Sequence, residues 1–245
     1  DTINTVKTLI QYAVFCAVPL FLIVCEPDLS TTLDVFAILF VMLFVAGLSY
    51  KIIGIVVLCL IPLAGSFMWY VKQPDPLFLK DYQQERILSF LYPDEYASTT
   101  QYQQDNSVMA IGSGQLFGKG LNNSTLATVK DANLISEQQT DFIFSVVGEE
   151  LGFVGSTLII VILGLIVVQC IRTARKASDS NGMFIATGVA TLVGVQTFLN
   201  IGVATSLLPN TGIPLPFISY GLSSLVSSCA GMGLVMNVSL QRRKY

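Results

Sequence analysis

The sequence predicts an all-α, polytopic integral membrane protein. Of its 245 residues, 53% are hydrophobic and only 12% are charged, and the mean hydropathy is +0.67. The charged share is about half that of a soluble domain, which is too little to wet a soluble surface. The net charge of −3 gives no support for nucleic-acid binding. The chain has no histidine, which excludes Ser-His and Cys-His catalysis and histidine-bound zinc.

Six stretches are apolar enough to cross a bilayer as helices, which takes about 20 residues each. They lack the alternation of polar and apolar side chains that membrane β-strands show. The first two are shorter than a full span, so their polar flanks must reach the interface. We treat residues 1–245 as a single membrane domain with about six transmembrane helices, at 9–24, 33–48, 52–71, 151–171, 183–208 and 213–238.

Basic residues predict the orientation of these spans, because Lys and Arg gather in cytoplasmic loops. Alternating crossings place on one side Lys7, Lys51, Arg172, Arg175, Lys176, Arg242, Arg243 and Lys244. The long loop at 72–141 then lies on the other side of the membrane. We therefore expect a multi-pass protein of the cytoplasmic membrane whose active face is extracytoplasmic.

The loop at 72–141 is too long for a simple connection, because loops beyond about 15 residues are usually functional or disordered. Residues 81–91 are expected to form a short helix at the membrane interface. The glycine-rich run MAIGSGQLFGKG at 109–120 matches neither a Walker A loop nor a dinucleotide-binding loop. Taken alone it favours a tight turn that feeds a helix, and the alternative is a backbone cradle that binds an anionic group with Lys119.

Acidic residues interrupt or border apolar stretches at several places. Asp141 stands where polar loop meets apolar helix, as an N-cap or as a partly desolvated general base, two roles that can coexist. Glu149 and Glu150 either face a cavity or partner, or lie at the interface where a span begins. For Asp34, inside a span, we favour a place on a polar cavity over pairing with a base. The pair Pro27 and Asp28 is typical of the start of a helix.

The most distinctive stretch is NIG at 200–202 followed by the segment LPNTGIPLPFISYG at 208–221. Its three prolines cannot continue a helix. Non-helical backbone at membrane depth is tolerated only where it is buried in protein or lines a wet cavity. We predict a re-entrant or broken-helix element beside a polar cavity, with Ser219, Ser223 and Ser224 available to line it.

Together these motifs resemble those of the SEDS family (shape, elongation, division and sporulation proteins), the group of RodA, FtsW and SpoVE. The likeness covers almost the whole chain in the family's order. It rests on EPDLST at 26–31, YQQDNS at 102–107, AIGSG at 110–114, FGKG at 117–120, TDFIF at 140–144, GEELG at 148–152 and the segment at 208–221.

The resemblance implies a peptidoglycan glycosyltransferase of the bacterial cytoplasmic membrane. Such an enzyme polymerises lipid II into glycan strands at the outer face, for cell elongation, shape or division, with a class B penicillin-binding protein as partner. Asp141 would be the catalytic base. Lys119 or Arg86 would offset charge on the leaving pyrophosphate. The remaining candidates for substrate binding are Ser113, Glu137, Thr140, Glu150, Ser219 and Ser223. No organic cofactor and no protein-bound metal are expected, and a requirement for a divalent cation is left open.

The chain also departs from the family pattern. Family members have roughly ten spans of about 20 residues, so we expect the C-terminal part of such a protein, as a fragment of a longer chain or a truncated product. Gln139 stands where the family has His, and Ser136 where it has Pro. Two other functions are therefore kept as alternatives: a flippase for lipid-linked precursors, suggested by the broken helix and Asp34, and an inactive scaffold of the elongation or division machinery.

Overall fold

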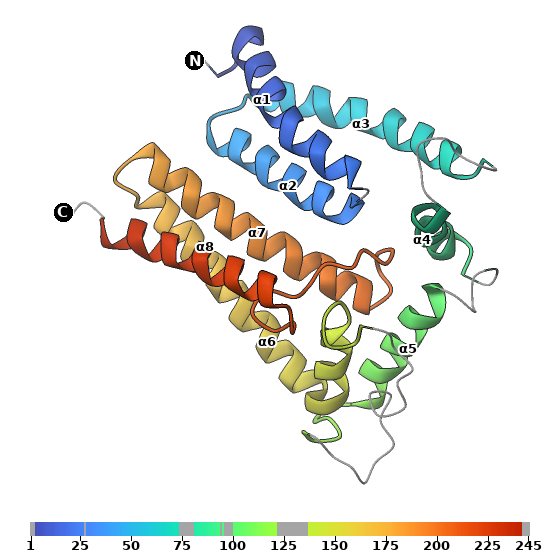
Figure 1. The fold of residues 1–245 in the computed structure, drawn as a ribbon. Helices are drawn as coiled ribbons and strands as arrows, with labels where there is room; N and C mark the ends of the chain where they lie inside the picture. The colour runs from blue at the N-terminus through green and yellow to red at the C-terminus, as the bar shows by residue number, and fades with distance from the viewer. Residues whose placement is uncertain are drawn as a thin grey trace.

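The structure is a computed structural model, and it describes residues 3–26, 28–73, 81–93, 95, 100–121 and 137–241. Within these ranges the chain folds into α-helices and contains no β-strand. Figure 1 shows the helices in chain order: α1 (Val6–Cys25), α2 (Leu29–Val45), α3 (Tyr50–Val71), α4 (Asp81–Leu91), α5 (Thr100–Ser113), α6 (Ile143–Arg175), α7 (Ser180–Ala204) and α8 (Leu222–Leu240).

The all-α prediction is confirmed. Among the described helices, α1, α3, α6, α7 and α8 are long and apolar enough to cross a membrane, and α2 is a shorter apolar helix of 17 residues. Helix α4 has the bounds predicted for the short helix of the long loop. The predicted basic cluster at the C-terminus, Arg242, Arg243 and Lys244, lies outside the described residues, as do Pro27 and Ser136.

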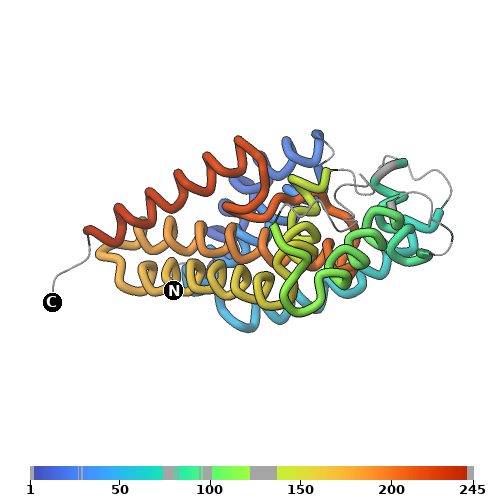
Figure 2. Tube along the Cα trace, turned by 90° about the horizontal axis from the view of Figure 1, so that it is seen from below, coloured from blue at the N-terminus to red at the C-terminus, as the bar shows by residue number. Residues whose placement is uncertain are grey.

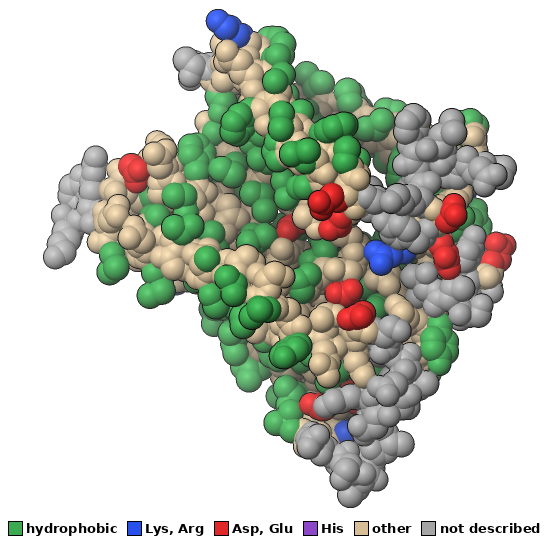
Figure 3. All heavy atoms as spheres, viewed as in Figure 1, with side chains coloured by type: hydrophobic (Ala, Val, Ile, Leu, Met, Phe, Trp, Pro, Cys, Tyr) green, Lys and Arg blue, Asp and Glu red, His purple; other side chains and the backbone are tan. Residues whose placement is uncertain are grey.

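Helix α7 is the centre of the bundle, because it packs against α2, α6 and α8. Small side chains allow this close packing: Ala186 and Ala190 of α7 are buried with Cys170 and Ala174 of α6. By contrast, the apolar side chains of α1 and α3 are largely exposed. In a space-filling view, hydrophobic side chains cover the long helices, while most of the visible acidic side chains gather beside α4 and the start of α2 (Figure 3).

The chain reverses direction at each span. The start of α1, the turn between α6 and α7 and the end of α8 lie toward one end of the molecule, and α4 and α5 lie at the other end (Figures 1 and 2). This alternation is what six successive crossings require. It also puts the described basic residues Lys7, Lys51 and Arg175 away from α4 and α5.

Helix α6 is kinked at Gly152, whose φ of 66° and ψ of −165° are not helical. A Cβ at this position would lie 2.3 Å from the backbone nitrogen of Gly118. Only glycine allows both the positive φ and this close approach. The kink separates a short first part that carries Glu149 from the apolar remainder, which the sequence predicts as a span at 151–171.

The last predicted span, at 213–238, begins too early. Helix α8 starts at Leu222, and residues 205–221 contain no α-helix. The predicted broken-helix element is therefore present, and it is inserted into the bundle: Ile213 and Leu215 are buried, and Leu215 packs with Phe144 and Ala204. The segment is as apolar as a helix because it is buried, so hydropathy alone did not mark where the helix begins.

Candidate active site

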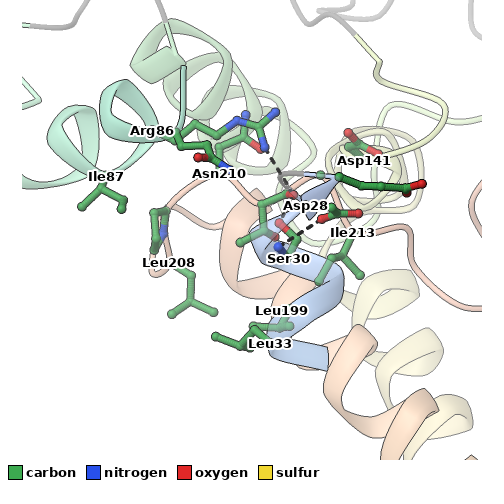
Figure 4. Close-up of a pocket in the computed structure, with 15 residues that line it drawn as sticks. Asp28, Ser30, Leu33, Arg86, Ile87, Asp141, Leu199, Leu208, Asn210 and Ile213 are labelled. Carbon is green, nitrogen blue, oxygen red and sulfur yellow. Dashed lines mark hydrogen bonds between the residues drawn. The ribbon is translucent and has the colours of Figure 1, made fainter. Parts of the chain in front are cut away.

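A cavity of about 530 Å³ opens where the inserted segment meets the starts of α2 and α6 and the helix α4 (Figure 4). Its lining combines charged and apolar side chains. The lining residues are Glu26, Asp28, Ser30, Leu33, Gln83, Arg86, Ile87, Asp141, Leu199, Leu208, Pro209, Asn210, Thr211, Gly212 and Ile213. Two of the residues predicted to act in catalysis or substrate binding, Asp141 and Arg86, are among them.

Asp141 is not a helix N-cap. The cap position of α6 is Phe142, and no side chain caps this end. The Asp141 carboxylate instead lies against Gly212, where a Cβ would be 3.2 Å from Oδ2 of Asp141 and 3.9 Å from Nη1 of Arg86. Gly212 has a φ of 74°, so glycine provides both the turn and the room in which the acid and the base approach each other.

The surroundings of Asp141 suit a proton acceptor. Burial raises the pKa of the Asp141 carboxyl above its ordinary value, and the nearby charge of Glu137 raises it further. Arg86 and a hydrogen bond from Thr140 act in the opposite direction and lower the pKa. A carboxylate with a raised pKa is a stronger base than an exposed one, which is the property that general-base catalysis requires.

The backbone around Asp141 is fixed by buried hydrogen bonds. Nδ2 of Asn200, on α7, donates to the carbonyl oxygens of Asp141 at 2.7 Å and Ile213 at 2.8 Å. Asn200 is 1% exposed. The sequence placed Asn200 in the most distinctive stretch but predicted no role for it in the site, although an amide inside an apolar span is a signal for such a role.

Ser219 does not line the cavity. Its hydroxyl donates to the carbonyl oxygen of Thr140 at 2.6 Å and accepts from the backbone N–H of Leu215 at 2.7 Å. The N–H of Tyr220 donates to the carbonyl oxygen of Gln139 at 2.9 Å. Two of these hydrogen bonds join the inserted segment to the loop before α6, and the third lies within the inserted segment. Ser219 therefore binds backbone groups and does not face the cavity.

Arg86 reaches the cavity from α4. Its Nη1 donates to the carbonyl oxygen of Thr211 at 3.5 Å, and the hydroxyl of Ser30 donates to the same oxygen. Asp28 caps α2 by accepting from the backbone N–H groups of Ser30 and Thr31, as the sequence predicts for a helix start. Figure 4 shows Asp28, Ser30 and Arg86 around the same part of the cavity as Asp141.

Lys119 belongs to a second cluster, at the kink of α6. Its Nζ lies 2.7 Å from Oε1 of Glu149, which is 1% exposed, and the Ser113 hydroxyl is 3.4 Å from the same oxygen. The backbone N–H of Lys119 donates to the carbonyl oxygen of Glu149, and that of Gly120 to Glu150. The glycine-rich run therefore begins as the end of α5 and continues, from Gly114, as a tight turn packed on α6, so the turn follows a helix instead of feeding one. Lys119, Ser113 and Glu150 are not among the cavity-lining residues.

The remaining candidates do not line the cavity. Thr140 Oγ1 lies 3.0 Å from Oε2 of Glu137. Ser223 is exposed in the first turn of α8. Asp34, for which a place on the cavity was favoured, is buried and accepts a hydrogen bond from Gln196 at 2.8 Å. Within the described residues, no group of three acidic or cysteine side chains is placed to hold a metal ion.

The chain is an all-helical bundle of long apolar helices, with Asp141 and Arg86 in a cavity at one end. These features define the class of multi-pass membrane proteins with a polar site at the end of the helix bundle. The model of the cell cycle protein family, which groups FtsW, RodA and SpoVE, matches residues 2–244. The chain belongs to this family, and the resemblance seen in its motifs is confirmed.

Curated relatives support the assignment. The chain is 40% identical over 222 residues to stage V sporulation protein E of Bacillus subtilis, covering 91% of this chain and 57% of the relative. It is 37% identical over 233 residues to a probable peptidoglycan glycosyltransferase FtsW of Geobacter metallireducens (95% and 58%). It is 34% identical over 225 residues to the peptidoglycan glycosyltransferase MrdB of Escherichia coli (92% and 58%). The chain thus spans less than two thirds of these relatives.

Solved structures agree with the fold. A chain of the structure described as "Structural coordination of polymerization and crosslinking by a peptidoglycan synthase complex" matches with a TM-score of 0.76 and 28% identity, over 99% of this chain and 65% of that chain. The rod shape determining protein RodA of Thermus thermophilus matches with a TM-score of 0.61 and 27% identity, over 99% and 59%.

Proposed function

We propose that this chain forms the catalytic part of a peptidoglycan glycosyltransferase that polymerises lipid II at the outer face of the cytoplasmic membrane. The observation that carries the proposal is the convergence of Asp141 and Arg86 on Gly212 inside the cavity. Two relatives named as peptidoglycan glycosyltransferases support it.

The proposed reaction forms one glycosidic bond. A sugar hydroxyl oxygen attacks the anomeric carbon of the second substrate, the bond from that carbon to the pyrophosphate oxygen breaks, and the hydroxyl proton passes to Asp141. The pyrophosphate leaves with the bonding electron pair, and Arg86 offsets the growing negative charge. None of these steps needs histidine or an organic cofactor. Chelation of divalent cations during the assay tests whether a cation also assists the pyrophosphate.

The apolar part of the cavity suits the lipid carrier. Leu33 and Leu199 line it below the charged residues (Figure 4), and Leu33 is 53% exposed. An apolar opening of this kind would let a polyprenyl chain stay in hydrocarbon while its headgroup reaches Asp141. The outer-face location rests on the Lys and Arg distribution, because Lys7, Lys51 and Arg175 lie at the end of the bundle away from the cavity.

The proposed partner is a class B penicillin-binding protein, which would crosslink the strands. The family resemblance and the likeness to a chain of a peptidoglycan synthase complex support this partner.

The test is Asp141→Asn in the full-length protein, assayed for lipid II polymerisation together with its partner. We expect a loss of at least roughly 100-fold, as is typical when a general base is removed. The control is Glu95→Gln, because Glu95 is an exposed acid that does not line the cavity. Normal polymerisation by Asp141→Asn would contradict the proposal. A flippase would instead move headgroup-labelled lipid II across liposomes without making glycan, and a scaffold would do neither.

A further inference from the structure

Helices α2 and α7 are joined inside the bundle by one polar pair. Nε2 of Gln196 donates to Oδ2 of Asp34 at 2.8 Å, and Asp34 is only 4% exposed. Both residues lie in otherwise apolar stretches. Neither lines the cavity. Polar side chains at such a depth are costly and usually serve a purpose.

This pair lies one helical turn below the contacts that shape the cavity. Ser30 precedes Asp34 by four residues on α2, and Asn200 follows Gln196 by four residues on α7, so each shares a helix face with its neighbour. Ser30 donates to the carbonyl oxygen of Thr211. Asn200 donates to the carbonyl oxygens of Asp141 and Ile213.

The two helices thus hold opposite sides of the same site. Through Ser30, α2 fixes the carbonyl that Arg86 also binds, and through Asn200, α7 fixes the backbone of Asp141. A shift of α2 along α7 would change the separation of Arg86 and Asp141. Figure 4 shows Leu33 of α2 beside Leu199 of α7 in the lower part of the cavity lining, with Ser30 above them.

We infer that Asp34 and Gln196 are positioning residues. They set the register of α2 against α7 and thereby the separation of Asp141 and Arg86. The inference rests on the proposed function for its activity readout, while the geometric readout below does not need it. The pair acts on the reaction through Ser30 and Asn200, without touching substrate.

A purely stabilising role makes the opposite prediction. Oδ1 of Asp34 is buried and has no hydrogen-bond partner within the described part of the chain. A buried acid with one unbonded oxygen does not stabilise the packing of two apolar helices. A leucine of similar size would pack between them, and insert into the membrane, at least as well. Asp34→Leu should therefore keep the thermal stability of the protein while it slows the reaction.

The first experiment measures lipid II polymerisation by the full-length protein with its partner. We expect kcat to fall about tenfold or more in Asp34→Leu, with KM changed less than twofold, because small displacements of reacting groups cost large factors in rate. Asp34→Asn should restore kcat, since its amide oxygen still accepts from Gln196. Gln196→Leu and the double variant should match Asp34→Leu, as expected of residues that act as one unit.

The control for this series is Thr191→Val, which removes a hydroxyl that donates within α7 to the carbonyl oxygen of Thr187. It should leave kcat unchanged. A melting temperature that falls in Asp34→Leu, with kcat per folded molecule unchanged, would overturn the inference.

The second experiment needs no substrate. In a cysteine-free background in detergent, Ile213→Cys reports the site, because Ile213 is 5% exposed and held by Asn200. We expect maleimide to label this cysteine at least fivefold faster when Asp34→Leu is added. Tyr220→Cys, at an 82% exposed position, should label equally fast in both backgrounds. Unchanged labelling of Ile213→Cys would overturn the positioning role of Asp34 and Gln196. Faster labelling, in a protein whose parent makes no glycan, would support the positioning role and contradict the proposed function.

Discussion

Two clusters in this protein each combine a basic and an acidic residue, and they differ in what lies between the charges. At the kink of α6, the half-buried Lys119 of the glycine-rich turn touches the buried Glu149 at 2.7 Å. At the cavity, Arg86 and Asp141 approach Gly212 from two sides and border open space. The first pair satisfies its own charges, while the second leaves room for a ligand to take part, which is why we assign the chemistry to the second.

The largest effect should come from breaking the kink pair. Lys119→Met removes the ion pair of the buried Glu149, and breaking a buried ion pair typically costs about 3–5 kcal/mol of stability. Thermal unfolding of the solubilised protein measures this loss, and adding Glu149→Gln should recover part of it by removing the orphaned charge. Lys7→Met, at an exposed position, is the control. A normal melting temperature for Lys119→Met would show that the two clusters do not differ as described.

Breaking the cavity pair should have the opposite signature. Arg86→Gln should lower the rate of lipid II polymerisation roughly 100-fold, because a charge that stabilises the leaving group is lost. Its melting temperature should change little. The polymerisation rate of Arg86→Lys should lie between those of the wild type and Arg86→Gln, since lysine keeps the charge without the planar geometry. A large loss of stability with normal activity per folded molecule would place Arg86 with Lys119 as a structural residue.

A smaller difference is expected between Ser219, which binds buried backbone groups, and Ser223, which is exposed. Ser219→Ala removes the bonds to Thr140 and Leu215 and should cost about 1–3 kcal/mol, because buried backbone groups lose their partner. Ser223→Ala, at an exposed site, should stay within about 0.5 kcal/mol. Chemical or thermal unfolding of both variants measures the difference. Equal stability of the two variants would argue against the role assigned to Ser219.

The smallest effect concerns pH. The rate should rise with pH as Asp141 loses its proton, and this rise should lie above the range of an ordinary carboxyl because burial and Glu137 raise its pKa. Glu137→Gln removes a negative neighbour, so the rise should move to lower pH. The pH profile of kcat/KM measures the shift. A profile that moves to higher pH in Glu137→Gln would mean that Glu137 does not act on Asp141 through its charge.

Much of the fold could be predicted because hydropathy reports burial in lipid. The bounds of α4 could be predicted from a short segment in which polar and apolar side chains are mixed. The spans could be predicted from long apolar runs. The start of α8 could not be predicted in this way, since residues 213–218 are apolar and buried or half-buried but not helical. The three prolines marked the break in the helix and left its end point open.

The site divides along a similar line. The chain's residues determined the membrane class and the family, and they marked Asp141 as a candidate, because composition, proline placement and local motifs are properties of the sequence itself. The folded bundle alone decided that Lys119 meets Glu149, that Arg86 meets Asp141 across Gly212, and that Asn200 and Ser219 hold the backbone between them. Those contacts join positions far apart in the chain, and the distance between two side chains depends on how helices pack, which no local pattern encodes.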